Sequence, residues 1–319
     1  MTWLARAWRA WVALMDRREP ATALALVRIC VALVLLVDFA WLAHTGMIDA
    51  LWSPLPAGYA TAHAGWLDAL GISPFGLWMI AMIAIACILV GAATRVACVV
   101  FVFVSAQQAA LAPDSESGVD MLFRIVLLIL ALSRCNARWS VDAVVMRRLG
   151  KPMPALVPAW PRYLMSFQLL WVYFSGGQNK SSHDWGPFGG FSALGQALLD
   201  PHNGRLDPDV IGALYPLTRV ATALTIAFEL TALLYLLWLY YAATPDKPGR
   251  LRRFANRARL RWIWFGLYVA FEIGIAVGLK LGSFPYGMLA LWSVLLLPDE
   301  LERLVARLRQ RLKMPAPAN

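Results

Sequence analysis

Long apolar stretches, each close to the length of a membrane-spanning helix, dominate the hydropathy pattern of this chain. A helix needs about 20 mainly apolar residues to cross a bilayer. The pattern predicts eight spans, at 22–43, 76–92, 95–112, 119–133, 161–178, 217–243, 260–279 and 283–298. Only GAATR separates the second span from the third, which predicts a tight helical hairpin. We therefore expect an all-α fold, a polytopic membrane helical bundle of about eight transmembrane helices.

Both ends of the chain carry a different pattern, that of amphipathic helices. Near the start, Leu4, Trp8 and Trp11 fall on one helical face, and Arg6 and Arg9 fall opposite. A tryptophan-rich face backed by arginines suits a helix that lies in the membrane interface, although it also suits packing against another domain. The tail alternates leucines and arginines in the same way. We expect an interfacial helix at 1–20, a transmembrane bundle at 21–298 and a cytoplasmic basic amphipathic tail at 299–319.

Composition supports the membrane assignment. The chain has 319 residues, of which 60% are hydrophobic and 15% charged, whereas soluble domains are about 45–50% apolar and about 25% charged. The lipid bilayer is therefore the expected partner. The net charge of +10 raises the alternative of nucleic acid binding. We expect no nucleic acid partner, because the basic residues lie on alternate loops. The four cysteines lack metal-ligand spacing, so no metal site is expected.

The basic residues also predict an orientation. Of the 29 Lys and Arg, 23 lie in the termini and alternate loops that share one side, four lie on the opposite side and two lie inside spans. Cytoplasmic loops carry the excess of Lys and Arg. The split predicts a multi-pass protein of the inner cell membrane with both termini cytoplasmic.

A polar cluster follows the fifth span on the opposite, extracytoplasmic side, in the stretch VYFSGGQNKSSHDW. The pair Gly176 and Gly177 predicts a helix end or a close helix approach. A long Gly- and Pro-rich loop, at 178–217, follows. Lys180 has two interpretations. It is an anchor that reaches toward the interface, or, partly removed from water, it serves as a general base.

Charged residues inside the predicted spans form a second group of candidates. They cost about 2.5–3.5 kcal/mol each at the bilayer centre, so they should face the bundle interior and find partners. They either join helices structurally or line a polar cavity. We expect Arg28 to pair with an acidic group of another helix, Glu229 first. The structural set is Arg28, Asp38, Arg124 and Glu229.

At these residues the sequence resembles the vitamin K-dependent γ-carboxylase family and its bacterial relatives, the horizontally transferred transmembrane (HTTM) domain proteins. YFSGGQNKSSHDW is similar to the family stretch that has a Tyr-Phe pair, a Gly, a lysine and an Asp-Trp pair at this spacing. VRICVALVLLVD resembles the first span of the family, and TRVACVVF, WSVDAV and LGSFPYGML also match. The resemblance runs in order from about residue 20 to 305.

The resemblance implies an active site around Lys180, which falls on the lysine that deprotonates vitamin K hydroquinone. A reduced quinone of the vitamin K type, CO2 and O2 are implied only in this way. The family's histidine at the start of the fourth span has no counterpart, and Asp120 lies nearby. Glu272 stands where the family commonly has a histidine in the seventh span. A buried glutamate could replace that histidine as a proton carrier, or it could simply pair with Arg124 or Lys280. The expected catalytic residues are Lys180, Glu272, Asp120 and His183, and the expected substrate or cavity residues are Asp184, Trp185, Tyr173, Gln168 and Gly177.

Two classes of function remain open from the sequence. The first is a quinol-dependent enzyme, carboxylase-like or epoxidase-like, that uses Lys180 as its base. The second is a non-enzymatic or accessory membrane protein for maturation, export or immunity of a secreted peptide. The sequence shows no inverted repeat or paired broken helices, which argues against a small-solute transporter.

Overall fold

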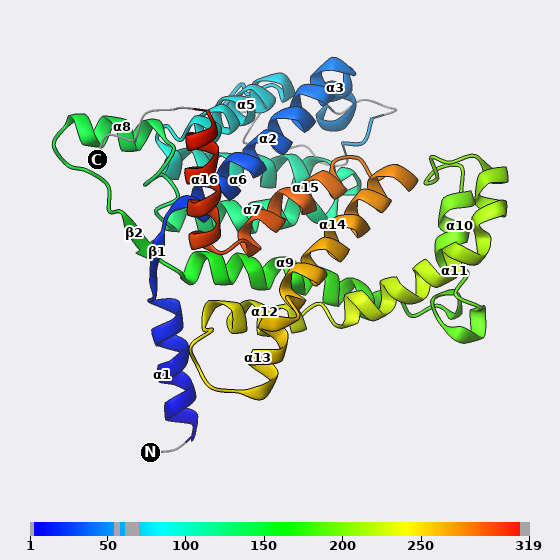
Figure 1. Cartoon of the computed structure of the whole chain (residues 1–319). Helices are drawn as coiled ribbons and strands as arrows, with labels where there is room; N and C mark the ends of the chain where they lie inside the picture. Colours follow the sequence, from blue (N-terminus) through cyan, green and yellow to red (C-terminus); the bar gives the residue numbers. More distant parts are fainter. Residues whose placement is uncertain (1–2, 54–57, 61–69, 313–319) are drawn as a thin grey trace. The chain divides into compact units, whose positions relative to one another are not determined.

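The computed structural model describes residues 3–53, 58–60 and 70–312, and it is largely helical (Figure 1). This confirms the all-α prediction; one short antiparallel ladder accompanies the helices. The chain divides into two compact units. The first comprises Met1–Met165 and Ser293–Asn319, and the second comprises Ser166–Trp292. Positions 313–319 of the predicted tail lie outside the described residues.

Unit 1 contains the helices that the first four predicted spans describe. Its elements are α1 (Trp3–Met15), β1 (Arg18–Pro20), α2 (Thr22–His44), α3 (Met47–Trp52), α5 (Pro74–Val90), α6 (Thr94–Leu111), η1 (Pro113–Ser115), α7 (Gly118–Leu132), α8 (Val141–Arg148), β2 (Leu156–Pro158) and, near the C-terminus, α16 (Pro298–Arg311). In the core, α5 packs against α2 and α6, and α6 packs against α7. The predicted hairpin of spans two and three is therefore present as α5 and α6.

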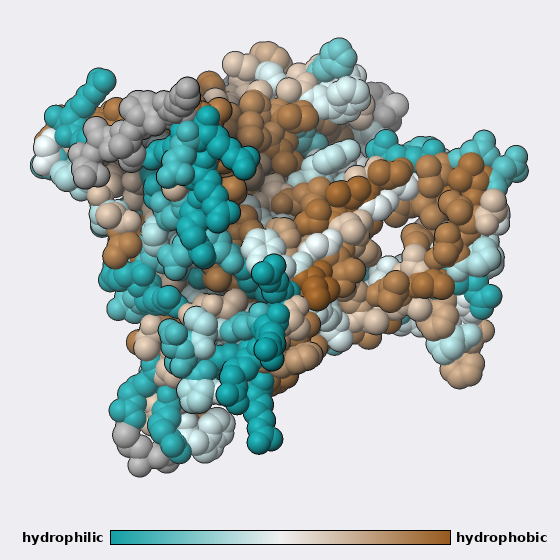
Figure 2. Space-filling model, viewed as in Figure 1, coloured by the Kyte–Doolittle hydropathy of each residue, from teal (hydrophilic) through white to brown (hydrophobic). Residues whose placement is uncertain are grey.

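Unit 2 contains the later helices. Its elements are most of α9 (Trp160–Asn179), η2 (His183–Trp185), η3 (Pro187–Gly189), α10 (Ala193–Leu199), α11 (Pro208–Leu230), α12 (Leu234–Ala243), α13 (Arg250–Arg257), α14 (Leu260–Gly278) and α15 (Phe284–Leu291), followed by η4 (Trp292–Leu295) at the boundary with unit 1. α10 packs on α11, and α14 packs on α12, α13 and α15. In unit 2 apolar side chains cover α11 and α14, as Figure 2 shows.

Four described helices are long and apolar enough to cross a membrane, namely α2, α6, α11 and α14. The segments Pro74–Val90, Leu234–Ala243 and Phe284–Leu295 are apolar but shorter. Large apolar side chains such as Val37, Ile263 and Val277 are at least half exposed on these helices, as expected for residues that face lipid. The helices define a membrane protein, and the count of eight spans stays a prediction.

The predicted continuous span at 217–243 is wrong, because the structure divides it between α11 and α12. The hydroxyl of Thr231 donates to the carbonyl of Ala227, a bond that competes with helix geometry and favours a bend. Beyond it, the amides of Leu234, Tyr235 and Leu236 each donate three residues back instead of four. The helix therefore tightens and breaks after Leu230.

The structure also corrects the long loop expected at 178–217. Two turns of 3-10 helix and α10 fill its first half, and α11 begins at Pro208. Asp207 caps α11, since its side chain accepts from the amide of Asp209, and Pro208 suits the first helical position. The segment after Lys180 is thus folded.

Arg28 fastens the hairpin turn of unit 1. It is fully buried and donates to the carbonyls of Ile88 at 2.9 Å and Trp139 at 2.5 Å. The turn passes close to the guanidinium at Gly91, where an added Cβ would lie 2.1 Å from Nη1 and where φ is +73°. Only glycine suits this position.

A carboxylate outside the spans completes the same junction. Asp142 accepts from the amides of Ala93 and Thr94, at 2.8 and 3.1 Å, and from Asn136 at 2.8 Å. Burial alone would raise the pKa of the Asp142 carboxyl, but these hydrogen bonds outweigh it and lower the pKa. Asp142 thus caps the start of α6 from α8.

Candidate functional site

One face of α9 carries the residues that sequence analysis singled out. Tyr173, Gly176, Gly177 and Lys180 follow at intervals of three, one and three residues, so they lie on one side of a helix. With a rise of about 1.5 Å per residue, the seven steps from Tyr173 to Lys180 cover about 10 Å along the axis. Two carboxylates, from α11 and α14, contact the two ends of this face. Together they form a polar line along α9, whose remaining residues are mainly apolar.

Lys180 and Glu229 form an ion pair at the end of the polar line that lies just beyond α9. The Nζ of Lys180, one residue beyond α9, lies 2.9 Å from Oε1 and 2.8 Å from Oε2 of Glu229. It also lies 3.4 Å from the carbonyl oxygen of Gly176. The side chain of Lys180 is 22% exposed and that of Glu229 is 7% exposed. The pair therefore has a buried carboxylate and an amine that reaches the surface of the unit.

Gly177 allows the two helices that carry the pair to approach closely. A Cβ at this position would lie 2.9 Å from Cβ of Glu229 and 3.1 Å from the backbone nitrogen of Leu230. Real Cβ atoms essentially never come as near as 2.9 Å to another atom, so a side chain here would require α9 or α11 to shift. At Gly176 the nearest atoms would lie 3.7 Å away, which is ordinary contact. Small residues allow such close packing in membrane helices.

The segment after Lys180 places an aromatic ring over the amine. The Nζ lies 5.1 Å from the ring centroid of Trp185, within the range of a cation–π contact. Asp184 holds this segment in place, since it accepts from Ser192 at 2.8 Å and from Gln196 at 3.1 Å. His183 is exposed at the start of η2. Trp185 therefore contacts the pair, whereas Asp184 anchors the fold around it.

Glu272 contacts the other end of the polar line, at Tyr173. It is fully buried in α14, and Oε1 accepts a hydrogen bond from the hydroxyl of Tyr173. Trp292 donates to that same hydroxyl at 2.9 Å. The hydroxyl of Tyr173 thus accepts from Trp292 and donates to Glu272 at the same time. The Oε2 of Glu272 has no hydrogen-bond partner among the described residues. An aromatic shell, including Tyr268 and Phe271, surrounds the ring of Tyr173.

The remaining expected residues have other surroundings. Asp120, in unit 1, accepts from the amide and hydroxyl of Ser117, both at 2.8 Å, and so caps α7. Arg124 pairs with Glu116. Gln168 and Asp38 are half-buried on α9 and α2. In the structure, Trp185 and Glu229 contact Lys180, and Tyr173 contacts Glu272.

The partner expected for Arg28 is not the one found. Arg28 donates to backbone carbonyls in unit 1, while Glu229 pairs with Lys180 in unit 2. Carbonyl groups at the end of a helix lack intrahelical donors, so they serve an arginine as well as a carboxylate does. Sequence analysis therefore missed both the acceptors of Arg28 and the role of Glu229. The one available signal was that Lys180 and Glu229 are both polar residues in apolar surroundings.

The helical membrane architecture and this polar line define the class of protein, an integral membrane protein with a polar site inside its helices. The HTTM domain family model matches residues 16–244, and the chain belongs to this family. The matched stretch includes Lys180, Trp185 and Glu229, whereas Glu272 and Trp292 follow it. No solved structure matches the chain.

Proposed function

We propose that this HTTM-family protein is a membrane enzyme that removes a proton from a reduced quinone, with Lys180 as general base and Glu229 as its proton partner. The observation that carries the proposal is the contact of Nζ of Lys180 with both carboxylate oxygens of Glu229. A base that works repeatedly must pass on the proton that it receives. The buried carboxylate is in direct contact to take it.

The surroundings of the pair suit a proton exchange. Transfer of one proton across the contact, from the ammonium of Lys180 to the carboxylate of Glu229, gives the neutral form of the pair, an amine beside a carboxylic acid. In the neutral form the amine has a free electron pair and can accept a substrate proton. Because Lys180 is the more exposed member, a substrate would meet the amine and not the carboxylate.

The choice of substrate rests on the family resemblance, with one supporting contact. A reduced quinone has an acidic hydroxyl and, once deprotonated, electrons to give to O2; a carboxylase-like reaction would also need CO2. A flat ring of this kind suits the indole of Trp185, which already lies beside the amine. Tyr173, farther along the same face of α9, and its partner Glu272 of α14 would hold a second exchangeable proton.

The test is quinol consumption by the purified protein in lipid nanodiscs under O2, with and without bicarbonate. Loss of a general base typically costs 10²–10⁴-fold in rate. We expect Lys180→Ala to lose activity by about this factor, and Lys180→Arg as well, because an arginine does not give up its proton. Lys280→Ala is the matched control, since that lysine binds the carbonyl of Pro201 and should be dispensable.

A protein with an accessory function in peptide maturation, export or immunity would not consume quinol. In that case the pair only joins α9 to α11. The unaltered protein would then consume no quinol beyond the Lys180→Ala background, and this outcome would contradict the proposal.

A further inference from the structure

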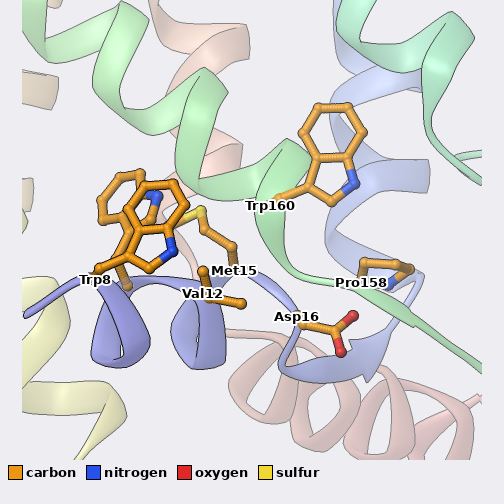
Figure 3. Close-up of a pocket in the computed structure, with 7 residues that line it drawn as sticks. Trp8, Val12, Met15, Asp16, Pro158 and Trp160 are labelled. Atoms are coloured by element: carbon orange, nitrogen blue, oxygen red, sulfur yellow. The ribbon is translucent and has the colours of Figure 1, made fainter. Parts of the chain in front are cut away.

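The structure carries a second candidate site, a pocket of about 320 Å³ in unit 1 between the first helix and the start of α9. Its lining comes from three segments and consists of Trp8, Trp11, Val12, Met15, Asp16, Pro158 and Trp160. Figure 3 shows Trp8, Val12 and Met15 on the side of α1 that faces Trp160, with Asp16 and Pro158 toward one end. The volume lies within the range of small-molecule sites.

The two walls of the pocket are fastened together just beside it. Arg18 pairs with Pro158 and Glu19 with Val157 in the ladder of β1 and β2. The amide of Ala159 donates to the carbonyl of Arg17 at 2.8 Å. Below the ladder, Arg162 donates to both carboxylate oxygens of Glu19, at 2.8 and 2.9 Å, in a buried pair. The pocket is thus held in shape by backbone and by a two-bond ion pair.

The lining has the chemistry of a cation site. Three tryptophans line the pocket, and indole rings attract ammonium groups. Asp16 adds the one carboxylate among residues 3–18, in a stretch that otherwise has only basic charges. An exposed ion pair of this carboxylate with Arg18, at 3.3 Å, is open to exchange because such pairs are weak.

The residues beside the pocket carry positive charge, opposite to that of Asp16. Arg17 and Arg18 are exposed and follow Asp16 directly in the chain. An exposed carboxylate at one end of an aromatic pocket and arginines beside it complement a ligand that carries an ammonium group next to a phosphate. This is the headgroup of a zwitterionic phospholipid. Trp3, Trp8 and Trp11 are each more than half exposed, as expected for an interfacial helix.

We infer that this pocket binds the headgroup of a zwitterionic phospholipid, with the ammonium group among Trp8, Trp11 and Trp160 near Asp16 and the phosphate at Arg17 and Arg18. The bilayer supplies this ligand at high concentration. The site would fix α1 at the membrane surface through one bound lipid, beyond general partition of its tryptophans into the interface. It does not depend on the proposed reaction at Lys180.

Native mass spectrometry of the purified full chain tests the site. Short-chain phosphatidylethanolamine, phosphatidylcholine and phosphatidylglycerol are titrated below their micelle-forming concentrations. We expect one molecule of either zwitterionic lipid to be retained and phosphatidylglycerol to bind more weakly. Trp8→Ala and Asp16→Asn should each weaken the zwitterionic lipids by about tenfold, the factor for one cation–π or charge contact.

Trp3→Ala is the matched control, because this tryptophan lies on the same helix, is 70% exposed and does not line the pocket. It should leave lipid retention unchanged. Equal losses in Trp3→Ala and Trp8→Ala would show general interfacial contact and overturn the inference. Preferential retention of phosphatidylglycerol would overturn it as well, in favour of a purely anionic ligand. Unchanged melting temperatures show that the variants are folded.

Discussion

The buried charges of the two units are satisfied in different ways. In unit 1, Arg28 is fully buried and donates to carbonyl groups at the end of α5 and at Trp139, and Arg162 and Glu19 are joined by two hydrogen bonds in a pair that is 2% and 7% exposed. In unit 2, the side chain of Lys180 is 22% exposed, although its partner Glu229 is only 7% exposed. Complete burial suits charged groups that join segments of the chain. Partial exposure lets a charged group exchange a proton with a substrate or with water.

The largest effect is expected when one member of the buried Arg162–Glu19 pair of unit 1 is removed. Arg162→Ala should lower the free energy of unfolding by about 3–5 kcal/mol, because it leaves the Glu19 carboxylate buried without its partner. Asp16→Ala removes an exposed pair and should cost less than about 1 kcal/mol. Both are measured by denaturant titration of the purified protein. Equal costs would mean that burial does not distinguish the two pairs.

The close approach of α9 and α11 in unit 2 gives the next effect. Gly177→Ala should cost about 1–3 kcal/mol, since its Cβ would press on Glu229 and on the backbone of Leu230. It should also reduce any activity that depends on the Lys180–Glu229 contact. Gly176→Ala, one residue earlier, meets only ordinary contacts and should be close to neutral or slightly stabilising. If the two alanine variants melt alike, the packing of α9 on α11 is looser than described.

Two substitutions of Glu272 test whether its hydrogen bond or its charge stabilises unit 2. Glu272→Leu leaves the buried hydroxyl of Tyr173 without its acceptor and should cost about 1–3 kcal/mol. Glu272→Gln keeps an acceptor oxygen and should cost less. A thermal melt of the two variants beside the unaltered protein measures the difference. A glutamine variant that is as unstable as the leucine variant would show that the charge, and not the hydrogen bond, stabilises the site.

The smallest expected effect concerns pH and the capping carboxylate of unit 1. The pKa of Asp142 is lowered in the folded state, so its stabilising contribution is present above its unfolded pKa and is lost as the pH falls through the folded pKa. Asp142→Ala should therefore destabilise the protein at neutral pH and matter progressively less at acidic pH below about 4. Melting temperatures of the two proteins across this range are the measurement. A difference that is independent of pH would show that the carboxylate is not the group responsible.

Sequence analysis located most helices within a few residues. The expected spans 22–43, 95–112 and 260–279 correspond to Thr22–His44, Thr94–Leu111 and Leu260–Gly278, because apolar runs of this length allow few other structures. The break after Leu230 was not predicted, since the hydroxyl of Thr231 is compatible with a continuous helix until its bond to Ala227 is seen. The folded segment after Lys180 was also missed, because its short helices lack periodic apolar patterns.

Sequence analysis named candidate residues around Lys180 and did not predict their contacts. The polar cluster around Lys180 was evident because it interrupts an apolar chain. Its partner Glu229 lies 49 positions away on another helix, and the distance in sequence carries no information about pairing. The acceptors of Arg28 are backbone carbonyls, which every residue has, so no side-chain pattern could identify them.

The measurement that tests the central claim most directly is a double-mutant cycle on Lys180 and Glu229, with quinol consumption as the readout. If the two residues act as one proton-exchanging unit, Lys180→Ala, Glu229→Gln and the double variant should lose the same factor, about 10²–10⁴. Residues that act as a unit are not additive. Losses that multiply in the double variant, a Glu229→Gln protein that works at the unaltered rate, or an unaltered protein that consumes no quinol would each contradict the account.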